Sequence, residues 1–492
     1  MGPAVLVRAA LILLVATAAI VTPTDADLWG HLTFGRDIVT SGTPLQTDVY
    51  SFTSDRAWVN HEWLAEVSFF SAYRVGGSAG LILFKLAIIA TLLACVWTHL
   101  RKVAPQDLCW FLVGLTFVGT FWRTHNVRPQ LFSVLLFTFV LLCIKAADAG
   151  RRTRLYFVPP IVALWANLHG GWVVGLAVYG LWAIARTTDQ RVPLKLRVLP
   201  LAIGLLAGAA TLLNPWGSGL WTFLAETVRP ARADIEEWAP VTQYPLALGI
   251  PWGLTVASGG LALWRGGLPS RLDYLGVIGV LSVLAFFVGR LDAFFVLAVV
   301  ILLAPQLAAS WKGGQAASAS RQQRGMVAVT VIGVLGMLVP VARFVAPYST
   351  CLPIGGAWAP DSQGARFISE NRLTGRMLTW FDWGEYVIWH FGPALRVSMD
   401  GRRETVYSDA TIQAHRRFYE GDATAIPYLR QLTPDFLWLP SSLAVARQME
   451  SAGWSPLFAG LASTIWSRSL TRAPSQSSER PARSELRCFP GP

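Results

Sequence analysis

Long apolar runs separated by short polar segments fill the first two thirds of the chain. A helix needs about 20 apolar residues to cross the hydrocarbon core of a bilayer, so these runs predict membrane spans. The sequence on either side of His169-Gly170-Gly171 predicts a tight helical hairpin. We expect about eleven spans, at residues 4–22, 79–99, 107–123, 130–147, 155–168, 172–186, 198–214, 250–264, 273–289, 291–311 and 326–346.

After residue 346 the pattern changes to that of a small soluble domain, in which helical and strand-like stretches alternate. The expected helices lie near 361–372, 409–419, 423–431 and 442–452, and the expected strands at 376–381, 395–399, 436–440 and 464–467. We therefore predict a polytopic α-helical membrane domain over residues 1–346 and a small α/β domain over 347–470. The tail at 471–492 is rich in Ser, Pro and Arg, which predicts disorder.

Charge is scarce and unevenly placed. Only 14% of the 492 residues are charged, whereas a soluble chain carries about 25%. The net charge of +12 could suggest nucleic acid, but the basic residues lie in short segments between apolar runs, a pattern of membrane topology. With the N-terminus in the cytoplasm, five successive inner loops are basic, and an odd span count places the C-terminal domain outside. These loops hold Arg101 and Lys102; Arg151, Arg152 and Arg154; Arg186, Arg191, Lys195 and Arg197; Arg265 and Arg271; and Lys312, Arg321 and Arg324.

The first apolar run has a second interpretation, as a cleaved signal peptide. No clear small-residue cleavage site precedes Asp25, so we favour a retained span. Residues 23–78 lie outside in either case.

Neither the cysteines nor the glycine-rich segments indicate a known cofactor site. The five cysteines have no metal or redox spacing, and Cys95, Cys109 and Cys143 lie in apolar runs, where a reduced thiol is expected. There is no P-loop, dinucleotide or zinc motif, which argues against an ATP-driven transporter on this chain alone.

The loop at 23–78 is acidic and aromatic. Segments 28–40 and 62–74 have helical apolar spacing and predict amphipathic helices on the membrane surface. Asp25 and Asp27 follow the first span at the water boundary, where partial desolvation favours action as a base. The alternative is that both carboxylates cap the helix that follows.

Other outer segments carry polar residues that topology does not explain. Arg123, His125 and Arg128 form a basic cluster on the outer side, suited either to a lipid phosphate or to anchoring on lipid head groups. Lys85 lies within a span and should find a partner or reach the interface. Including polar residues of the loops, the candidate substrate-binding residues are His31, His61, Glu62, Arg123, His125, Arg128, Asn167, His169, Glu237 and Arg290.

Two polar, glycine-turned segments of the C-terminal domain, 381–386 and 399–404, could line a surface facing the membrane domain. Loops that pack the domain together are the favoured interpretation.

Several stretches carry a family resemblance. They are DADLWGHLTFGRDIV, TDVYSFT, WVNHEWLAE, RPQLFS, WANLHGGW, LNPWG, EEWAP, WGEYVIWHFGP and SMDGRRE, which together span nearly the whole chain. With them the chain resembles the GT-C superfamily of polytopic glycosyltransferases, and more closely a bacterial group of mannosyltransferase-like membrane proteins.

The resemblance implies a reaction and a location. A sugar would move from a polyprenyl-phosphate carrier to a glycan, lipid or protein acceptor at the outer face of the bacterial cytoplasmic membrane. Asp25 and Asp27 match the position of the family's base at the start of the first outer loop, which would deprotonate the acceptor hydroxyl for an inverting attack.

The resemblance also suggests what would stabilise the leaving phosphate. By role, Arg123, Arg128 and Arg290 would supply positive charge. Some family members use a divalent metal; Asp25, Asp27 and His31 could offer ligands, but this set is too loose to identify a site. No cofactor is therefore assigned.

A non-enzymatic function is the alternative, as a transporter or as a partner in envelope-polymer assembly. Transporters often show two similar halves, and the sequence has no internal repeat, which argues against that class.

Overall fold

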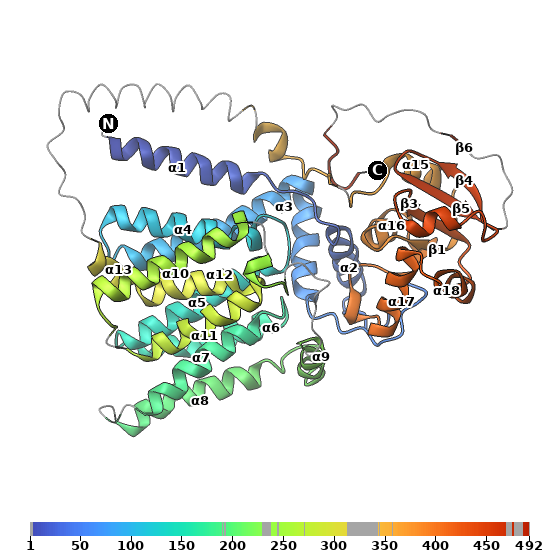
Figure 1. Cartoon of the computed structure of the whole chain (residues 1–492). Coiled ribbons are helices and arrows are strands. Elements are labelled where there is room, and N and C mark those ends of the chain that lie inside the picture. The colour runs from blue at the N-terminus through green and yellow to red at the C-terminus, as the bar shows by residue number, and fades with distance from the viewer. Residues whose placement is uncertain are drawn as a thin grey trace. The chain divides into compact units, whose positions relative to one another are not determined.

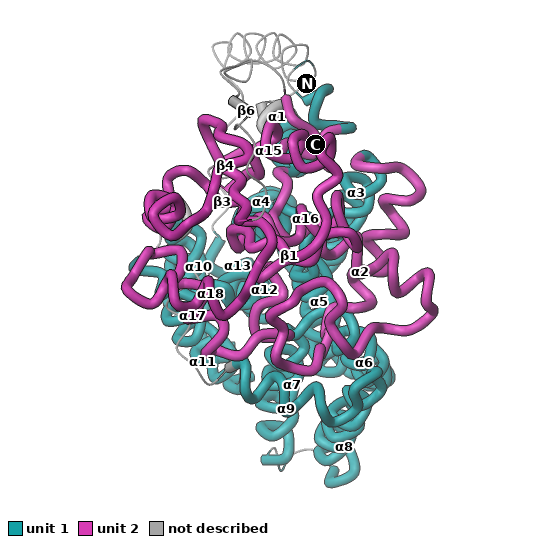
Figure 2. Tube along the Cα trace, turned by 90° about the vertical axis from the view of Figure 1, so that its right-hand side faces the viewer, with its two compact units in different colours: residues 1–22, 79–350 teal, residues 23–78, 351–492 magenta. Residues whose placement is uncertain are grey.

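The computed structural model describes residues 3–188, 190, 193–228, 238–243, 246–269, 271–311, 343, 345–356, 358–468, 475–476 and 486–491. The chain forms two compact units (Figure 2). Unit 1 consists of Met1–Thr22 and Ala79–Thr350, and unit 2 of Pro23–Ser78 and Cys351–Pro492. The segment Pro23–Ser78 thus folds with the C-terminal residues.

Unit 1 is helical (Figure 1). Its most buried element is α12, in which every residue from Asp292 to Leu302 is buried, and α4, α5, α10 and α11 pack against it. Its helices are α1 (Pro3–Ile20), the second part of α3 (Trp63–Leu100), α4 (Gln106–Thr124), α5 (Gln130–Asp148), η1 (Arg152–Phe157), α6 (Val158–Ala166), α7 (Trp172–Thr187), α8 (Leu194–Ala210), α9 (Gly219–Val228), η3 (Val241–Gln243), α10 (Leu246–Gly266), α11 (Asp273–Phe287), η4 (Gly289–Leu291), α12 (Asp292–Leu302), α13 (Ala304–Ser310) and η5 (Ala346–Ser349).

Within the described ranges, two helices are long and apolar enough to cross a membrane, namely α3 and α5. A third span results if the segment Gly289–Leu302, which comprises η4 and α12, is counted together with α13. These two segments pass the same test jointly, but the chain bends by 67° between them. α7 and α11 are shorter apolar helices. The expected count of eleven stays a prediction, and most of the span at 326–346 lies outside the described residues. The hairpin turn at His169 is confirmed, since α6 ends at Ala166 and α7 begins at Trp172.

Helix α3 contains a break that separates its two parts. Gly76 and Gly77 have non-helical backbone angles, and Gly77 has φ 56°, a conformation that glycine adopts without steric cost. The sequence predicts a surface helix at 62–74 and a span from residue 79. The break at Gly76-Gly77 lies between these two segments, and the two units divide at the same place.

Unit 2 contains a mixed six-stranded sheet of order β2-β1-β3-β5-β4-β6. β1 pairs in parallel with both β2 and β3, whereas β5 runs antiparallel to β3 and β4. The strands are β1 (Gly375–Thr379), β2 (Leu395–Val397), β3 (Phe436–Pro440), β4 (Ser455–Ala459), β5 (Ser463–Ser467) and β6 (Ser475–Gln476). The helices are α2 (Leu28–Ser41), the first part of α3, α15 (Ser362–Glu370), η6 (Phe381–Trp383), α16 (Gly384–Phe391), η7 (Arg403–Thr405), α17 (Asp409–Glu420), α18 (Ala425–Leu432) and η8 (Ala444–Gln448).

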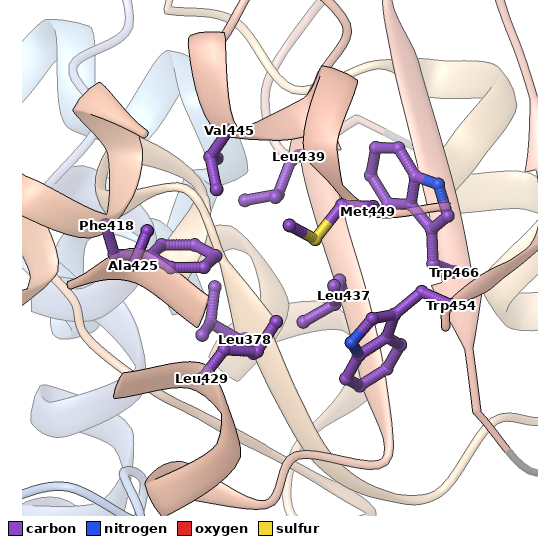
Figure 3. Packing of buried hydrophobic residues seen from close by; sticks show 10 residues of the cluster. All are labelled: Leu378, Phe418, Ala425, Leu429, Leu437, Leu439, Val445, Met449, Trp454 and Trp466. Atoms are coloured by element: carbon purple, nitrogen blue, oxygen red, sulfur yellow. The ribbon is translucent and has the colours of Figure 1, made fainter. Parts of the chain in front are cut away.

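The core on one face of this sheet joins β1, β3 and β5 to α17, α18 and η8 (Figure 3). Apolar side chains of the strands, such as Leu378 and Leu437, meet Phe418 and Met449 from the helical side, and all four are buried. The four expected strands and three of the four expected helices are confirmed. The fourth helix is the short 3-10 turn η8, while β4 and α16 were not predicted.

A disulfide joins Cys351 to Cys488 across 137 residues. It anchors the end of the chain, where the Pro490 carbonyl accepts a hydrogen bond from Trp29 Nε1 at 2.9 Å and Phe489 is buried. Composition predicts disorder for the whole tail, but residues 486–491 are packed in unit 2. Composition could not reveal this, because the bond depends on a partner far away in the sequence.

Candidate functional site

Asp25 and Asp27 lie at the start of α2, as the sequence predicts. Asp25 Oδ1 accepts a hydrogen bond from the backbone N–H of Asp27 at 3.0 Å. Asp27 occupies the N-cap position of α2, yet its side chain makes no capping hydrogen bond. The capping interpretation therefore does not account for the Asp27 carboxylate.

The capping acceptor for this helix is Glu385, which lies 355 residues further along the chain. Gly30 N–H, in the first turn of α2, donates to Glu385 Oε2 at 3.0 Å. A Cβ atom at Gly30 would collide with the Glu385 carboxylate, so the approach requires glycine. Glu385 is in the first turn of α16, which packs against α2. Glu385 therefore caps the first turn of α2, a role that the N-cap position would otherwise give to Asp27.

The carboxyl ends of two adjacent parallel strands bring further acids to the same place. Asp382 follows β1, and Asp400 follows β2. Gly401 lies against both Asp27 and Glu385; a Cβ atom there would overlap the Asp27 carboxylate and lie 2.8 Å from Glu385 Oε1. Both carboxylates thus converge on one glycine. We call Asp25, Asp27, Asp382 and Glu385 the acid-rich cluster.

Burial and the neighbouring carboxylates disfavour the charged forms of Asp382 and Glu385 in the acid-rich cluster. Burial, followed by the charges of Asp27 and Asp400, raises the pKa of Glu385 well above its ordinary value. Burial, together with Asp25, raises the pKa of Asp382 to about 6. The protonated form of Glu385 is therefore favoured relative to an exposed glutamate, and either form keeps an oxygen that accepts from Gly30 N–H. An ionisable carboxylate beside such groups is the usual arrangement for a general base.

Arg402 belongs to a neighbouring group in which one buried cation binds two carboxylates. Its guanidinium binds Asp400 through Nε at 2.9 Å and Nη2 at 2.7 Å, and Asp48 through Nη1 at 2.8 Å. Tyr407 donates to Asp400 Oδ2 at 2.9 Å. All these side chains are nearly or fully buried. We call Arg402, Asp48, Asp400 and Tyr407 the paired cluster.

His31 lies one turn after Asp27 in α2 and faces a buried acid. Its Nδ1 is 3.6 Å from Glu66 Oε1, and Glu66 Oε2 accepts from Asn60 at 2.6 Å. Burial alone lowers the pKa of His31, but the hydrogen bond to Glu66 and the charges of Glu62, Glu66 and Asp27 raise it overall. His61 Nε2 lies 3.6 Å from Glu62 Oε1, so these two candidates pair with each other.

In unit 1, Arg123 and Lys85 both have internal partners. Arg123 Nε binds Asp292 Oδ1 at 3.2 Å, and both side chains are buried. This ion pair joins the end of α4 to the start of α12, which is a structural role. Lys85 is fully buried and donates to the His125 carbonyl at 2.8 Å, so the expected partner for the lysine is confirmed.

Two other predicted cations remain partly accessible. Arg128 is half-buried immediately before α5, and the half-buried Arg290 stacks 5.1 Å from the centre of the Trp238 ring. His125 stacks on Phe121 with ring centroids 5.5 Å apart.

His169 and Asn167 are held at the turn between α6 and α7. His169 Nδ1 accepts from the Ser133 hydroxyl at 2.6 Å and from Gly171 N–H at 3.1 Å, while Trp165 Nε1 donates to Ser133 Oγ at 2.7 Å. A neutral His169 therefore carries its proton on Nε2. Asn167 donates to the carbonyl of Leu213 at 2.9 Å, which ties the turn to the end of α8.

The remaining expectations concern a metal and Glu237. Among the described residues, no three His, Cys, Asp or Glu side chains are arranged to hold a metal ion. Glu237 lies outside the described residues. Sequence reasoning missed Glu385, Asp382 and Asp400 as individual residues, although it singled out both segments that contain them. A lone Glu385 in an otherwise apolar helix was the available signal.

Comparison with known proteins rests on structure alone, since no family model and no curated protein matches the chain. Arabinofuranosyltransferase AftD from Mycobacteria superposes with a TM-score of 0.55 and 16% identity, covering 96% of this chain. This chain spans only 40% of AftD.

Two smaller proteins match over most of their own length. ArnT from Cupriavidus metallidurans gives a TM-score of 0.57 at 13% identity, covering 94% of this chain and 97% of its own. The Archaeoglobus fulgidus oligosaccharyltransferase gives 0.55 at 10% identity, covering 95% and 75%. Matching structures of these two proteins hold undecaprenyl phosphate and dolichol phosphate, respectively. At such identities the likeness shows the fold, which is GT-C-like as predicted.

Proposed function

We propose, from the GT-C-like fold and the acid-rich cluster, that this protein transfers a sugar from a polyprenyl-phosphate carrier to an acceptor hydroxyl. The observation that carries the proposal is the Asp27 carboxylate, held at a helix N-terminus whose capping is done by Glu385. The likeness to ArnT and to the oligosaccharyltransferase, both captured with polyprenyl-type phosphates, supports the choice of donor.

In the proposed reaction Asp27 removes the proton from the acceptor hydroxyl, and Asp25 holds the backbone at Asp27. The acceptor oxygen attacks the anomeric carbon from the side opposite the phosphate. The bond between that carbon and the phosphate oxygen breaks, and the electron pair leaves with the lipid phosphate. The configuration at the anomeric carbon is inverted.

The leaving phosphate needs hydrogen-bond donors and positive charge. Arg128 and Arg290 are the candidates that fit best, because both are cationic and partly accessible. His169 is suited to donate from Nε2, since its Nδ1 is occupied by Ser133 and Gly171. Arg123 is a weaker candidate than its charge suggests, because it is buried against Asp292.

We further place the acid-rich cluster at the outer face of the cytoplasmic membrane. Disulfides persist in oxidising compartments, and Cys351–Cys488 lies in unit 2 together with Asp27. The basic loops between the predicted spans support the same orientation.

The test is loss of transfer in Asp27→Asn, Asp25→Asn and the double variant. Mass spectrometry of envelope glycans and lipid-linked sugars, with and without the gene, first identifies the product. Removing the base should then lower the rate of its formation in isolated membranes by about 10²–10⁴-fold for Asp27→Asn.

Asp37→Asn, in the same helix α2, is the matched control and should retain activity while inserting to the same level. Full activity in Asp27→Asn, Asp25→Asn and their double would overturn the assignment and favour a non-enzymatic role.

A further inference from the structure

Unit 1 contains a cavity of about 880 Å³ that the proposed reaction does not use. It lies among the ends of α3 and α5, the turn η1, the start of α11, and the α12–α13 bend. Its walls include aromatic and aliphatic side chains such as Phe139, Leu142 and Ile161. Its volume is within the range of sites for small ligands.

Cations dominate the polar part of the cavity lining. Five Lys and Arg side chains line it, against a single carboxylate, Asp148, among the described residues. Asp148 is already engaged by Arg186 and Tyr274 and by Trp182 Nε1 at 3.2 Å. The cationic lining residues are Lys102, Lys145, Arg151, Arg154 and Arg271. The cavity therefore has an excess of positive charge that Asp148 does not neutralise.

Three of these cations are available to a ligand. Lys102, Arg151 and Arg154 are exposed, and no described carboxylate lies within ion-pair distance of them. The positive-inside rule accounts for basic residues in these loops, but not for their convergence on one cavity with apolar walls. A ligand that matches both features carries phosphate at one end and hydrocarbon at the other.

We infer that this cavity binds the phosphate head group and adjoining acyl chains of an anionic phospholipid. Basic pockets between membrane helices bind such head groups because Lys and Arg neutralise the phosphate while the apolar wall receives the chains. A soluble phosphate ester would offer the same phosphate group as the phospholipid. Only the phospholipid also has acyl chains that can contact the apolar wall. The inference does not depend on the glycosyltransferase proposal.

The experiment measures binding of phosphatidylglycerol to the purified full-length protein in detergent by native mass spectrometry. The test variant is Arg151→Gln/Arg154→Gln, which removes two exposed cations from the lining. Each such cation near a lipid surface contributes about 1 kcal/mol, so affinity should fall by roughly 10–30-fold. Phosphatidylcholine should bind more weakly than phosphatidylglycerol to the wild type.

The matched control is Arg152→Gln/Lys195→Gln, two exposed cations that do not line the cavity. It should bind phosphatidylglycerol as the wild type does, and unchanged apparent melting temperatures would show that both variants are folded. Equal affinity in the test and control variants would overturn the inference. So would competition by glycerol 3-phosphate as strong as that by the lipid, because a soluble anion would then suffice.

Discussion

The paired cluster and the acid-rich cluster lie next to each other in the folded unit 2, but they differ in how their charges are paired. Arg402 binds two carboxylates at 2.7–2.9 Å, so its buried charges are compensated by direct hydrogen bonds. Glu385 instead faces Asp27 and Asp400, and burial among these acids raises its pKa. The first arrangement stabilises a fold. The second costs free energy, which is the pattern expected where carboxylates are kept for chemistry.

The largest expected effect on stability comes from breaking the paired cluster. Arg402→Gln should destabilise the full chain by about 3–5 kcal/mol, because Asp48 and Asp400 would then be left buried without their cation. Thermal unfolding in detergent, followed by tryptophan fluorescence, measures this as a lower apparent melting temperature.

Arg416→Gln is the matched control, since Arg416 forms an exposed pair with Glu420 and should change stability by less than about 0.5 kcal/mol. If Arg402→Gln kept wild-type stability and lost only activity, the distinction between the two clusters would be wrong.

A smaller effect, of opposite sign, is expected in the acid-rich cluster. The pKa of Asp382 is about 6 in the folded protein, above its ordinary value of 3.8. The folded state therefore binds this proton more tightly than the unfolded state. The stability that it contributes is present below about pH 4 and is lost as pH rises through 6.

Asp382→Asn should accordingly match the wild type near pH 4 and be more stable by about 2–3 kcal/mol at pH 7.5. The measurement is the apparent melting temperature of both proteins across this pH range. Asp409→Asn, which removes an exposed acid in α17, should follow the wild type throughout. Parallel pH profiles for Asp382→Asn and the wild type would contradict the prediction, because they would show that folding does not raise the pKa of Asp382.

Features encoded locally could be predicted from the sequence. The strands β1, β2, β3 and β5 follow from short apolar runs, and the turn at His169 follows from Gly170 and Gly171. The position of Asp27 follows from the boundary between an apolar run and an acidic loop. Each of these signals lies within about 20 residues, where periodicity and turn chemistry can be seen.

Features that depend on distant partners could not be predicted. The acceptor for Gly30 N–H is 355 residues away, and nothing near Gly30 indicates a carboxylate above it. Arg402 carries the same charge as its neighbour Arg403, yet only the folded structure shows that Arg402 is buried between Asp48 and Asp400. The Cys351–Cys488 disulfide could not be predicted for the same reason, because its two cysteines are 137 residues apart.

The smallest expected effect separates the capping role of Glu385 from its charge. Glu385→Gln should be close to the wild type in stability, because glutamine has the shape of glutamate without its charge and keeps an oxygen acceptor for Gly30 N–H. Glu385→Ala should lose about 1–2 kcal/mol, since this buried N–H would lose its partner. It should also slow transfer, because the start of α2 holds Asp27. If Glu385→Gln were as damaging as Glu385→Ala in melting temperature and rate, Glu385 would be needed as an anion. The acid-rich cluster would then have to contain a compensating cation, and the contrast with the paired cluster would fail.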